Sequence, residues 1–126
     1  MKLNNYYLIN MKPFIHSQIS KHKFGGSCSD YQQIHDFIDS PKMCYPNIKH
    51  RAILHNSFGC YLVEQIFGIT ITNSDGRTVS TRDIAEQHIL DDLGYIPTVE
   101  DWLKELPVKD WMSAPITQTR TLSLKD

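Results

Sequence analysis

The segment from Tyr45 to Gly68 constrains the fold of this chain more than any other stretch. It reads YPNIKHRAILHNSFGCYLVEQIFG, and its apolar side chains would lie on nearly every side of an α-helix. A helix without a polar face is normally surrounded by other elements. Pro46 suits the first helical turn and Gly68 suits a helix end. The segment therefore predicts one long central helix that its neighbours cover.

The same segment carries the polar residues His50, Arg51, His55 and Glu64. Buried polar groups need hydrogen-bond or ionic partners. A central helix with these side chains therefore predicts a polar, metal-bearing centre inside the fold.

Capping and turn signals divide the rest of the chain into short elements. Ser29 followed by Gln32 has the form of a capping box, and Ser80 followed by Asp83 is a second helix start. Alternating apolar and hydroxyl residues flank the turn at 73–76, which is typical of a β-hairpin. The fold class that follows is mainly α, a single compact helical domain around a buried central helix with one small β-hairpin. The expected elements are helices near 13–24, 29–39, 46–68, 80–94 and 98–107, and a hairpin over 69–80.

A chain of 126 residues fits one domain. Residues 1–10 are predicted to be an N-terminal extension, 11–112 the helical domain, and 113–126 an extended or disordered tail.

Composition favours a cytoplasmic protein. The net charge of −1 gives no strong nucleic-acid signal, and no apolar run is long enough to span a membrane. The first ten residues lack the pattern of an export signal. Three cysteines without CxxC spacing suit free thiols in a reducing compartment. The oligomeric state is left open.

Six histidines in this length indicate a metal site assembled between helices. His50 and His55 are five residues apart, roughly 140° around a helix, so they cannot chelate one ion unless the helix is distorted. The better local pairs are His35 with Asp39 and His88 with Asp92, at i and i+4. Imidazole and carboxylate ligands suit zinc, iron or manganese. The candidate metal ligands are His16, His35, His50, His55 and His88.

The neighbours His35 and Asp36 resemble the metal-binding dyad of HD-type phosphohydrolases. That resemblance implies an upstream histidine and a downstream aspartate on long helices, which a chain of this length has little room for.

Arginines supply a candidate substrate site. Arg82 opens a predicted helix whose N-terminal N–H groups attract anions, and Arg51 lies on the central helix. Both are candidates to bind a phosphate or carboxylate, although Arg82 also has acidic neighbours to pair with. Glu86 is a candidate general base if it is buried beside His55, and a solvated helix residue otherwise.

An ordered string of motifs resembles a family of small bacterial and phage proteins that carries no assigned function. The resemblance covers roughly residues 12–112 and implies a bacterial or phage cytoplasmic setting, without a reaction. Members often carry two adjacent histidines followed by an acid where this chain has His55-Asn56-Ser57-Phe58, which leaves His55 as the ligand candidate there. The motifs are KFGG at 23–26, Tyr31 with Ile34-His35, KHRA at 49–52 with His55, IFG at 66–68, TNSDGR at 72–77, EQH at 86–88, DLG at 92–94, and IPT at 96–98 with Asp101-Trp102.

Three hypotheses about function follow. The leading one is a divalent-metal protein that uses His55, His88 and one further histidine to hydrolyse a phosphorylated or nucleotide-like substrate. The second is a non-catalytic binding module, such as a phage accessory protein that sequesters or inhibits a host factor. The third gives the polar centre a purely structural role, in which case His55→Leu is tolerated or stabilising.

Overall fold

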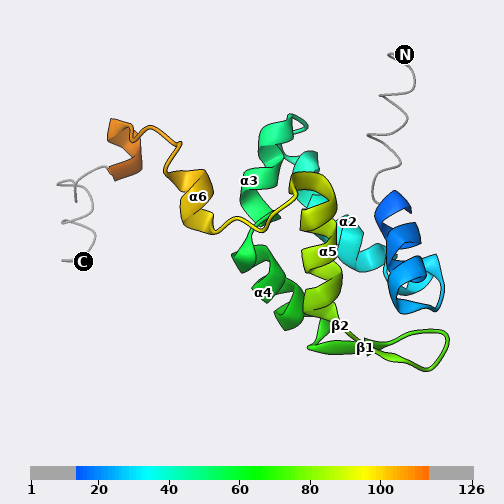
Figure 1. Cartoon of the computed structure of the whole chain (residues 1–126). Helices are drawn as coiled ribbons and strands as arrows, with labels where there is room; N and C mark the ends of the chain where they lie inside the picture. Colours follow the sequence, from blue (N-terminus) through cyan, green and yellow to red (C-terminus); the bar gives the residue numbers. More distant parts are fainter. Residues whose placement is uncertain (1–13, 114–126) are drawn as a thin grey trace, which may run out of the picture.

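The computed structural model describes residues 14–113 of the chain (Figure 1). That part is mainly helical with one two-stranded antiparallel sheet, as predicted. The predicted extension at 1–10 lies outside the described residues, as does the predicted tail apart from residue 113. Residues 14–24 are helical. The elements that follow, with η for a 3-10 helix, are η1 (Cys28–Asp30), α2 (Gln32–Asp39), η2 (Ser40–Met43), η3 (Ile48–His50), α3 (Arg51–Leu54), α4 (Ser57–Phe67), β1 (Thr70–Thr72), β2 (Thr78–Ser80), α5 (Thr81–Leu93), α6 (Val99–Leu103) and η4 (Asp110–Ser113).

Helix α5 is the element that the others pack around, with α4 and α2 both against it (Figure 1). Its Ile84, Ala85 and Ile89 are fully buried in the apolar core, whereas Gln87 and His88 are buried among polar groups. One helix therefore separates an apolar interior from a polar one. The apolar core consists of Tyr31, Ile34, Ile38, Cys60, Val63, Val79, Ile84, Ala85 and Ile89.

The ends of α5 are where the sequence predicts them. Ser80 Oγ accepts a hydrogen bond from the backbone N–H of Asp83 at 3.2 Å, which caps the first turn. Gly94 ends the helix with φ of 79°, a left-handed conformation that glycine adopts at low cost.

The prediction of one long helix over 46–68 is wrong. The chain instead forms η3, α3 and α4, with a break at His55 and Asn56. Asn56 has extended backbone angles, and its side-chain oxygen accepts a hydrogen bond from Gly59 N at 2.8 Å. A new helix therefore starts at this cap, and the backbone N–H of Ser57 bonds to Pro97 O instead of continuing the previous helix.

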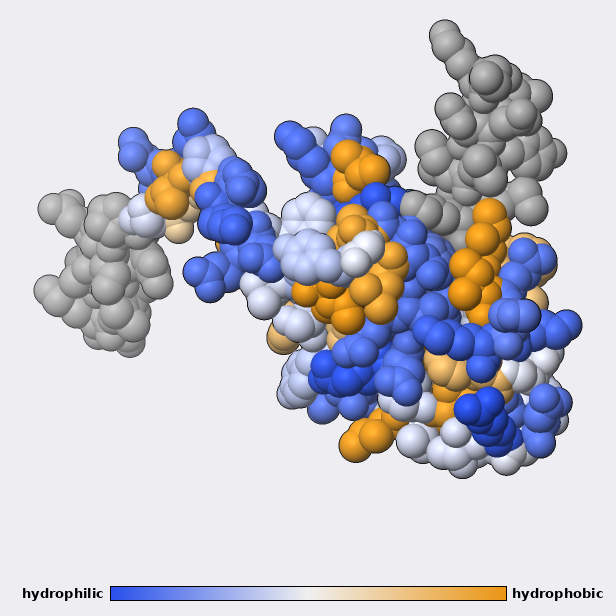
Figure 2. All heavy atoms as spheres, in the orientation of Figure 1, coloured by the Kyte–Doolittle hydropathy of each residue, from blue (hydrophilic) through white to orange (hydrophobic). Residues whose placement is uncertain are grey.

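The expected burial of this segment on all sides is also wrong. Cys60 and Val63 face the core, but Ile53, Phe58 and Ile66 are 53%, 48% and 56% exposed. The elements packed on α4 cover one side of it, so its outer apolar side chains reach the surface. Figure 2 shows hydrophobic residues among hydrophilic ones on the face viewed in Figure 1.

The hairpin forms as predicted, with Ile71 paired to Val79. Asp30 joins its turn to the loop before α2, because one carboxylate oxygen accepts hydrogen bonds from Ser27 N and Ser74 N, at 2.8 and 2.9 Å. The observed capping box is formed by Ser27 and Asp30, two residues before the predicted one at Ser29 and Gln32. No described helix is long and apolar enough to cross a bilayer.

Candidate metal centre

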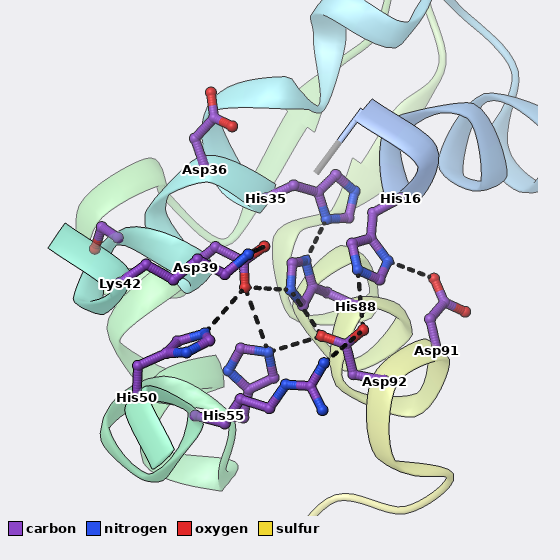
Figure 3. A network of polar contacts seen from close by, with 12 residues as sticks. His16, His35, Asp36, Asp39, Lys42, His50, His55, His88, Asp91 and Asp92 are labelled. Atoms are coloured by element: carbon purple, nitrogen blue, oxygen red, sulfur yellow. Dashed lines mark hydrogen bonds and ion pairs between the residues drawn. The ribbon is translucent and has the colours of Figure 1, made fainter. Parts of the chain in front are cut away.

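Five of the six histidines meet two aspartates in the polar interior beside α5 (Figure 3). None of the five histidines is more than 4% exposed, and the side chains of Asp39 and Asp92 are 6% and 1% exposed. The sixth histidine, His22, is exposed. Buried charges are normally paired or bound to metal ions, so this cluster is the candidate functional site. The five buried histidines are His16, His35, His50, His55 and His88.

Helix geometry supplies most of the cluster. α2 carries His35 and Asp39, and α5 carries His88 and Asp92, each pair at i and i+4 and therefore on one face of its helix. Residues 14–24 add His16 from a third helix.

The break between α3 and α4 brings in the other two histidines. An unbroken helix would point His50 and His55 in different directions, but their ring centroids lie 5.8 Å apart. The backbone carbonyl of His55 no longer has a helical partner, and it accepts a hydrogen bond from Trp102 Nε1 at 2.9 Å. Asn56 Nδ2 donates to Ala52 O at 3.0 Å, which ties the two helices together.

Four side chains have the geometry of a metal-binding group. One ligand atom from each of Asp39, His55, His88 and Asp92 lies within 4.8 Å of the other three. Nε2 of His55 is 3.5 Å from Asp39 Oδ1 and 2.9 Å from Asp92 Oδ2. Nε2 of His88 is 3.2 and 3.4 Å from the same two oxygens. Metal–ligand distances of about 2.0–2.2 Å put neighbouring ligand atoms about 3.0–3.5 Å apart, which these separations match.

A chain of hydrogen bonds fixes the proton positions behind His88, starting from Gln87. Gln87 Nε2 donates to His16 O and to Asp91 Oδ2, at 3.0 and 2.8 Å, so Gln87 Oε1 faces Ser20 Oγ as an acceptor at 2.5 Å. The Ser20 hydroxyl therefore donates away from His35. His35 Nε2 lies 2.7 Å from Ser20 Oγ and must carry the proton of that bond.

The proton on His35 Nε2 determines in turn which nitrogen of His88 faces the metal-binding group without a proton. Burial, together with the charges of the neighbouring His88 and His16, lowers the pKa of His35 to about 2, so His35 is neutral. With its one proton on Nε2, His35 accepts at Nδ1 from His88 Nδ1–H at 2.9 Å. A neutral His88 therefore has a bare Nε2 that faces the oxygens of Asp39 and Asp92. The lone pair of this nitrogen and the two carboxylate oxygens repel one another. A cation between them, either a proton or a metal ion, removes this repulsion.

The protonation states of Asp39 and His55 suit metal ligands, which must be deprotonated. Burial raises the pKa of Asp39, but the hydrogen bond and charge of His88 outweigh burial and lower it to about 2. Burial also lowers the pKa of His55, helped by the nearby His88. Burial lowers the pKa of His88 as well, but its bonds to Asp39 and Asp92 raise it by more. Metal ions would compete with protons chiefly at His88.

Each aspartate has one oxygen directed at the group and one directed away. The outer oxygen of Asp39, Oδ2, lies 3.7 Å from Lys42 Nζ. The outer oxygen of Asp92, Oδ1, lies 3.3 Å from His16 Nε2 and 3.7 Å from Arg51 NH2. Lys42 and Arg51, whose side chains are 29% and 14% exposed, thus stand between the carboxylates and solvent.

The structure gathers all five predicted metal residues and Arg51, but it does not bring Arg82 or Glu86 to the cluster. Arg82 donates to Glu64 Oε1 through Nε at 2.9 Å and NH2 at 2.6 Å. Glu86 precedes His88 by two residues, about 200° around α5, and lines a pocket with Lys23 on the opposite side. The HD-type dyad does not form either, because Asp36 is exposed and accepts a hydrogen bond from Gln32.

The sequence analysis paired Asp39 with His35 and Asp92 with His88 but did not include the two aspartates among the candidate ligands. Their signal was the i, i+4 spacing to His35 and His88, which places a carboxylate on the same helix face as an imidazole.

No curated protein and no solved structure matches the chain. One protein family does match, over residues 11–112, and its description is a domain of unknown function, DUF6915. Because the match spans most of the sequence and includes every residue of the metal-binding group, the chain belongs to the DUF6915 family.

Proposed function

We propose that this protein binds one divalent transition-metal ion through Asp39, His55, His88 and Asp92. The observation that carries the proposal is the convergence of one ligand atom from each of these four buried side chains, with His88 Nε2 3.2 and 3.4 Å from the inner oxygens of Asp39 and Asp92. Two carboxylates and two neutral imidazoles balance the charge of a divalent ion. This donor set, without thiolate, suits zinc, iron or manganese.

We further propose that the ion serves hydrolysis of a phosphorylated or nucleotide-like small molecule. A bound divalent ion lowers the pKa of a coordinated water and so supplies a nucleophile near neutral pH. Arg51 and Lys42 lie at the solvent side of the two carboxylates, where their positive charges would attract and orient a phosphate group. Arg82 has no part in this proposal, since its guanidinium is paired with Glu64.

The second candidate is a non-catalytic binding module, such as a phage accessory protein that sequesters a host factor. Two observations favour it. The four ligands are almost completely buried, as in structural metal sites, which are closed by protein ligands. Apolar side chains on α3 and α4 are also exposed, including Ile53 and Phe58, and exposed apolar surface is typical of protein-binding faces.

Elemental analysis of protein purified without chelator tests the metal proposal. We expect close to one equivalent of metal in the wild type and in His22→Gln, which changes an exposed histidine away from the cluster. His88→Gln should retain far less. Metal content near zero in the wild type, with no uptake of added zinc, iron or manganese, would refute the proposal.

Turnover then separates the two candidates. The metal-loaded protein would be assayed with p-nitrophenyl phosphate, bis-p-nitrophenyl phosphate and a panel of nucleotides. The hydrolase proposal expects metal-dependent turnover that Arg51→Met reduces. A protein that holds its ion but turns over none of these, and forms a stable complex with a host protein, is the binding module.

A further inference from the structure

His50 has one ring nitrogen whose proton is fixed by the backbone. Its Nδ1 lies 2.9 Å from the carbonyl oxygen of Asn47, and a carbonyl only accepts hydrogen bonds. Nδ1 therefore carries the proton, and the Nε2 of the neutral ring is a bare lone pair. The side chain is 4% exposed, so solvent has little access to that nitrogen.

This bare nitrogen is directed at the metal-binding group (Figure 3). His50 Nε2 makes no hydrogen bond to any residue in the described part of the chain. It lies 3.8 Å from Asp39 Oδ1, the same inner oxygen that His55 and His88 approach. Two lone pairs facing each other in a buried place repel, and a cation bound by both removes the repulsion.

His16 provides an internal contrast. Its Nδ1 also pairs with an acceptor, Asp91 Oδ2 at 2.9 Å, and its Nε2 also approaches a carboxylate of the group. The oxygen it approaches, however, is the outer one of Asp92, which Arg51 also contacts. His16 therefore contacts the oxygen of Asp92 that is directed away from the proposed ion. His50 instead approaches the inner oxygen of Asp39, on the side where the ion would bind.

We propose that His50 is a fifth protein ligand, which rests on the proposed metal binding. The centre then has three imidazoles and two carboxylates. His50 lies on the short element η3, directly before the four-residue helix α3, and the 3.8 Å between its Nε2 and Asp39 Oδ1 is slightly more than the roughly 3.0–3.5 Å between ligand atoms of one ion.

A five-ligand set decides which class of ion fits best. Structural zinc sites are almost always four-coordinate and tetrahedral, so five protein ligands disfavour that geometry. Iron(II) and manganese(II) accept mixed imidazole and carboxylate ligands, and a six-coordinate ion would keep one position for water or a substrate oxygen. The inference therefore assigns an iron(II)- or manganese(II)-type centre with a single exchangeable position.

Cobalt(II) is the probe that tests this coordination. Metal-free wild type, His50→Gln and the control His22→Gln, which changes an exposed histidine away from the cluster, would be titrated with cobalt(II) and followed by visible absorption. We expect weak d–d bands of a five- or six-coordinate ion in the wild type and in His22→Gln. In His50→Gln the bands should shift, and the affinity should fall by at least about tenfold, the lower end of what even outer-shell changes cost.

Each other outcome is decisive. Intense bands of a tetrahedral ion in the wild type, or wild-type bands and affinity in His50→Gln, would overturn the fifth ligand while leaving metal binding in place. No cobalt uptake by the wild type would overturn both proposals. If His50→Gln does not fold, electron spin echo spectroscopy of manganese(II)-loaded wild type counts the bound imidazole nitrogens. Three supports the inference and two overturns it.

Discussion

A buried histidine can bind a metal ion only through a ring nitrogen that carries no proton, so the position of one proton decides whether it can act as a ligand. In neutral His88, the ring nitrogen that carries the proton is set by a chain of hydrogen bonds that no metal would touch, which runs from Gln87 and Ser20 through His35. Outer partners of this kind set the tautomer and orientation of ligating histidines. This chain of hydrogen bonds also explains why so many polar side chains are buried here, because each residue in it supplies a hydrogen-bond partner for the next.

Ser20→Ala tests this chain without altering a ligand. His35 Nε2–H would lose its acceptor, and the other tautomer of His35 would require His88 to carry its proton on Nε2. We expect the affinity for zinc(II) or manganese(II) to fall about 10- to 100-fold, measured by competition with a chelating dye. Ser17→Ala is the matched control, since Ser17 is equally buried nearby but bonds to Gln32. Equal affinities in the two variants would contradict the assigned tautomer.

Gly59 is the residue on which the break between α3 and α4 depends. A Cβ at this position would lie 1.8 Å from the carbonyl oxygen of Leu54, and a backbone atom cannot move aside cheaply. We expect Gly59→Ala to lower the free energy of unfolding by at least about 3 kcal/mol, at the upper end of overpacking effects. Urea unfolding followed by circular dichroism measures this change.

Gly94→Ala is the comparison for Gly59. Nothing lies within 4 Å of the Cβ it would add, so only its positive φ opposes alanine, at a cost of about 1–2 kcal/mol. If Gly59→Ala unfolds at the same urea concentration as the wild type, Gly59 does not lie as close to the Leu54 carbonyl as the structure places it.

At the scale of elements, the hairpin is held by a loop as well as by its own ladder. Gly25 and Gly26 both have positive φ, and a Cβ on Gly26 would lie 2.4 Å from Asp30 Oδ2 and 2.9 Å from Asn73 Cβ. The Asp30 carboxylate then accepts hydrogen bonds from both segments. A two-stranded sheet is marginal alone, so this contact helps to keep it in place.

Asp30→Asn should destabilise the protein in a pH-dependent way. Backbone hydrogen bonds from Ser27 and Ser74 lower the pKa of Asp30 from its ordinary value of 3.8. A lowered folded-state pKa means that the ionised carboxylate stabilises the fold above about pH 4, and that this stabilisation is lost as pH falls through the folded-state pKa. Thermal unfolding at several pH values between 7 and 3 should show the difference between wild type and variant shrink at acid pH. A constant difference would contradict the assignment.

Local signals predicted some elements and could not predict others. Ser80 and Thr98 cap backbone N–H groups three residues ahead, and Gly94 ends α5 through its own φ, so the starts of α5 and α6 and the end of α5 follow from the sequence. The break at Asn56 depends on Pro97 and Trp102, which are distant in sequence and supply partners for Ser57 N and His55 O. The histidines could be predicted as metal ligands from their residue type. The carboxylates of Asp39 and Asp92 approach each other only when α2 and α5 pack together.

At the scale of the whole molecule, the candidate centre joins elements from different parts of the chain. Asp39 ends α2, His55 ends α3, and His88 and Asp92 lie on α5, so one ion would connect three helices. Without it, the same place holds two carboxylates and several imidazoles away from solvent. A ligand that binds only the folded state stabilises it by mass action. The proposed metal binding would therefore be coupled to global stability.

Chelation should lower the melting temperature of the wild type. Free metal at about 100 times its dissociation constant stabilises the folded state by about 2.7 kcal/mol. For a domain of this size that corresponds to a change of roughly 10 °C or more between metal-loaded and EDTA-treated protein, measured by scanning calorimetry. Asp92→Asn, which removes one ligand, should melt at nearly the same temperature with and without metal. If the polar centre were structural alone, EDTA would leave the wild-type melting temperature unchanged and His55→Leu would be tolerated, because a well-packed apolar replacement avoids the cost of burying polar groups.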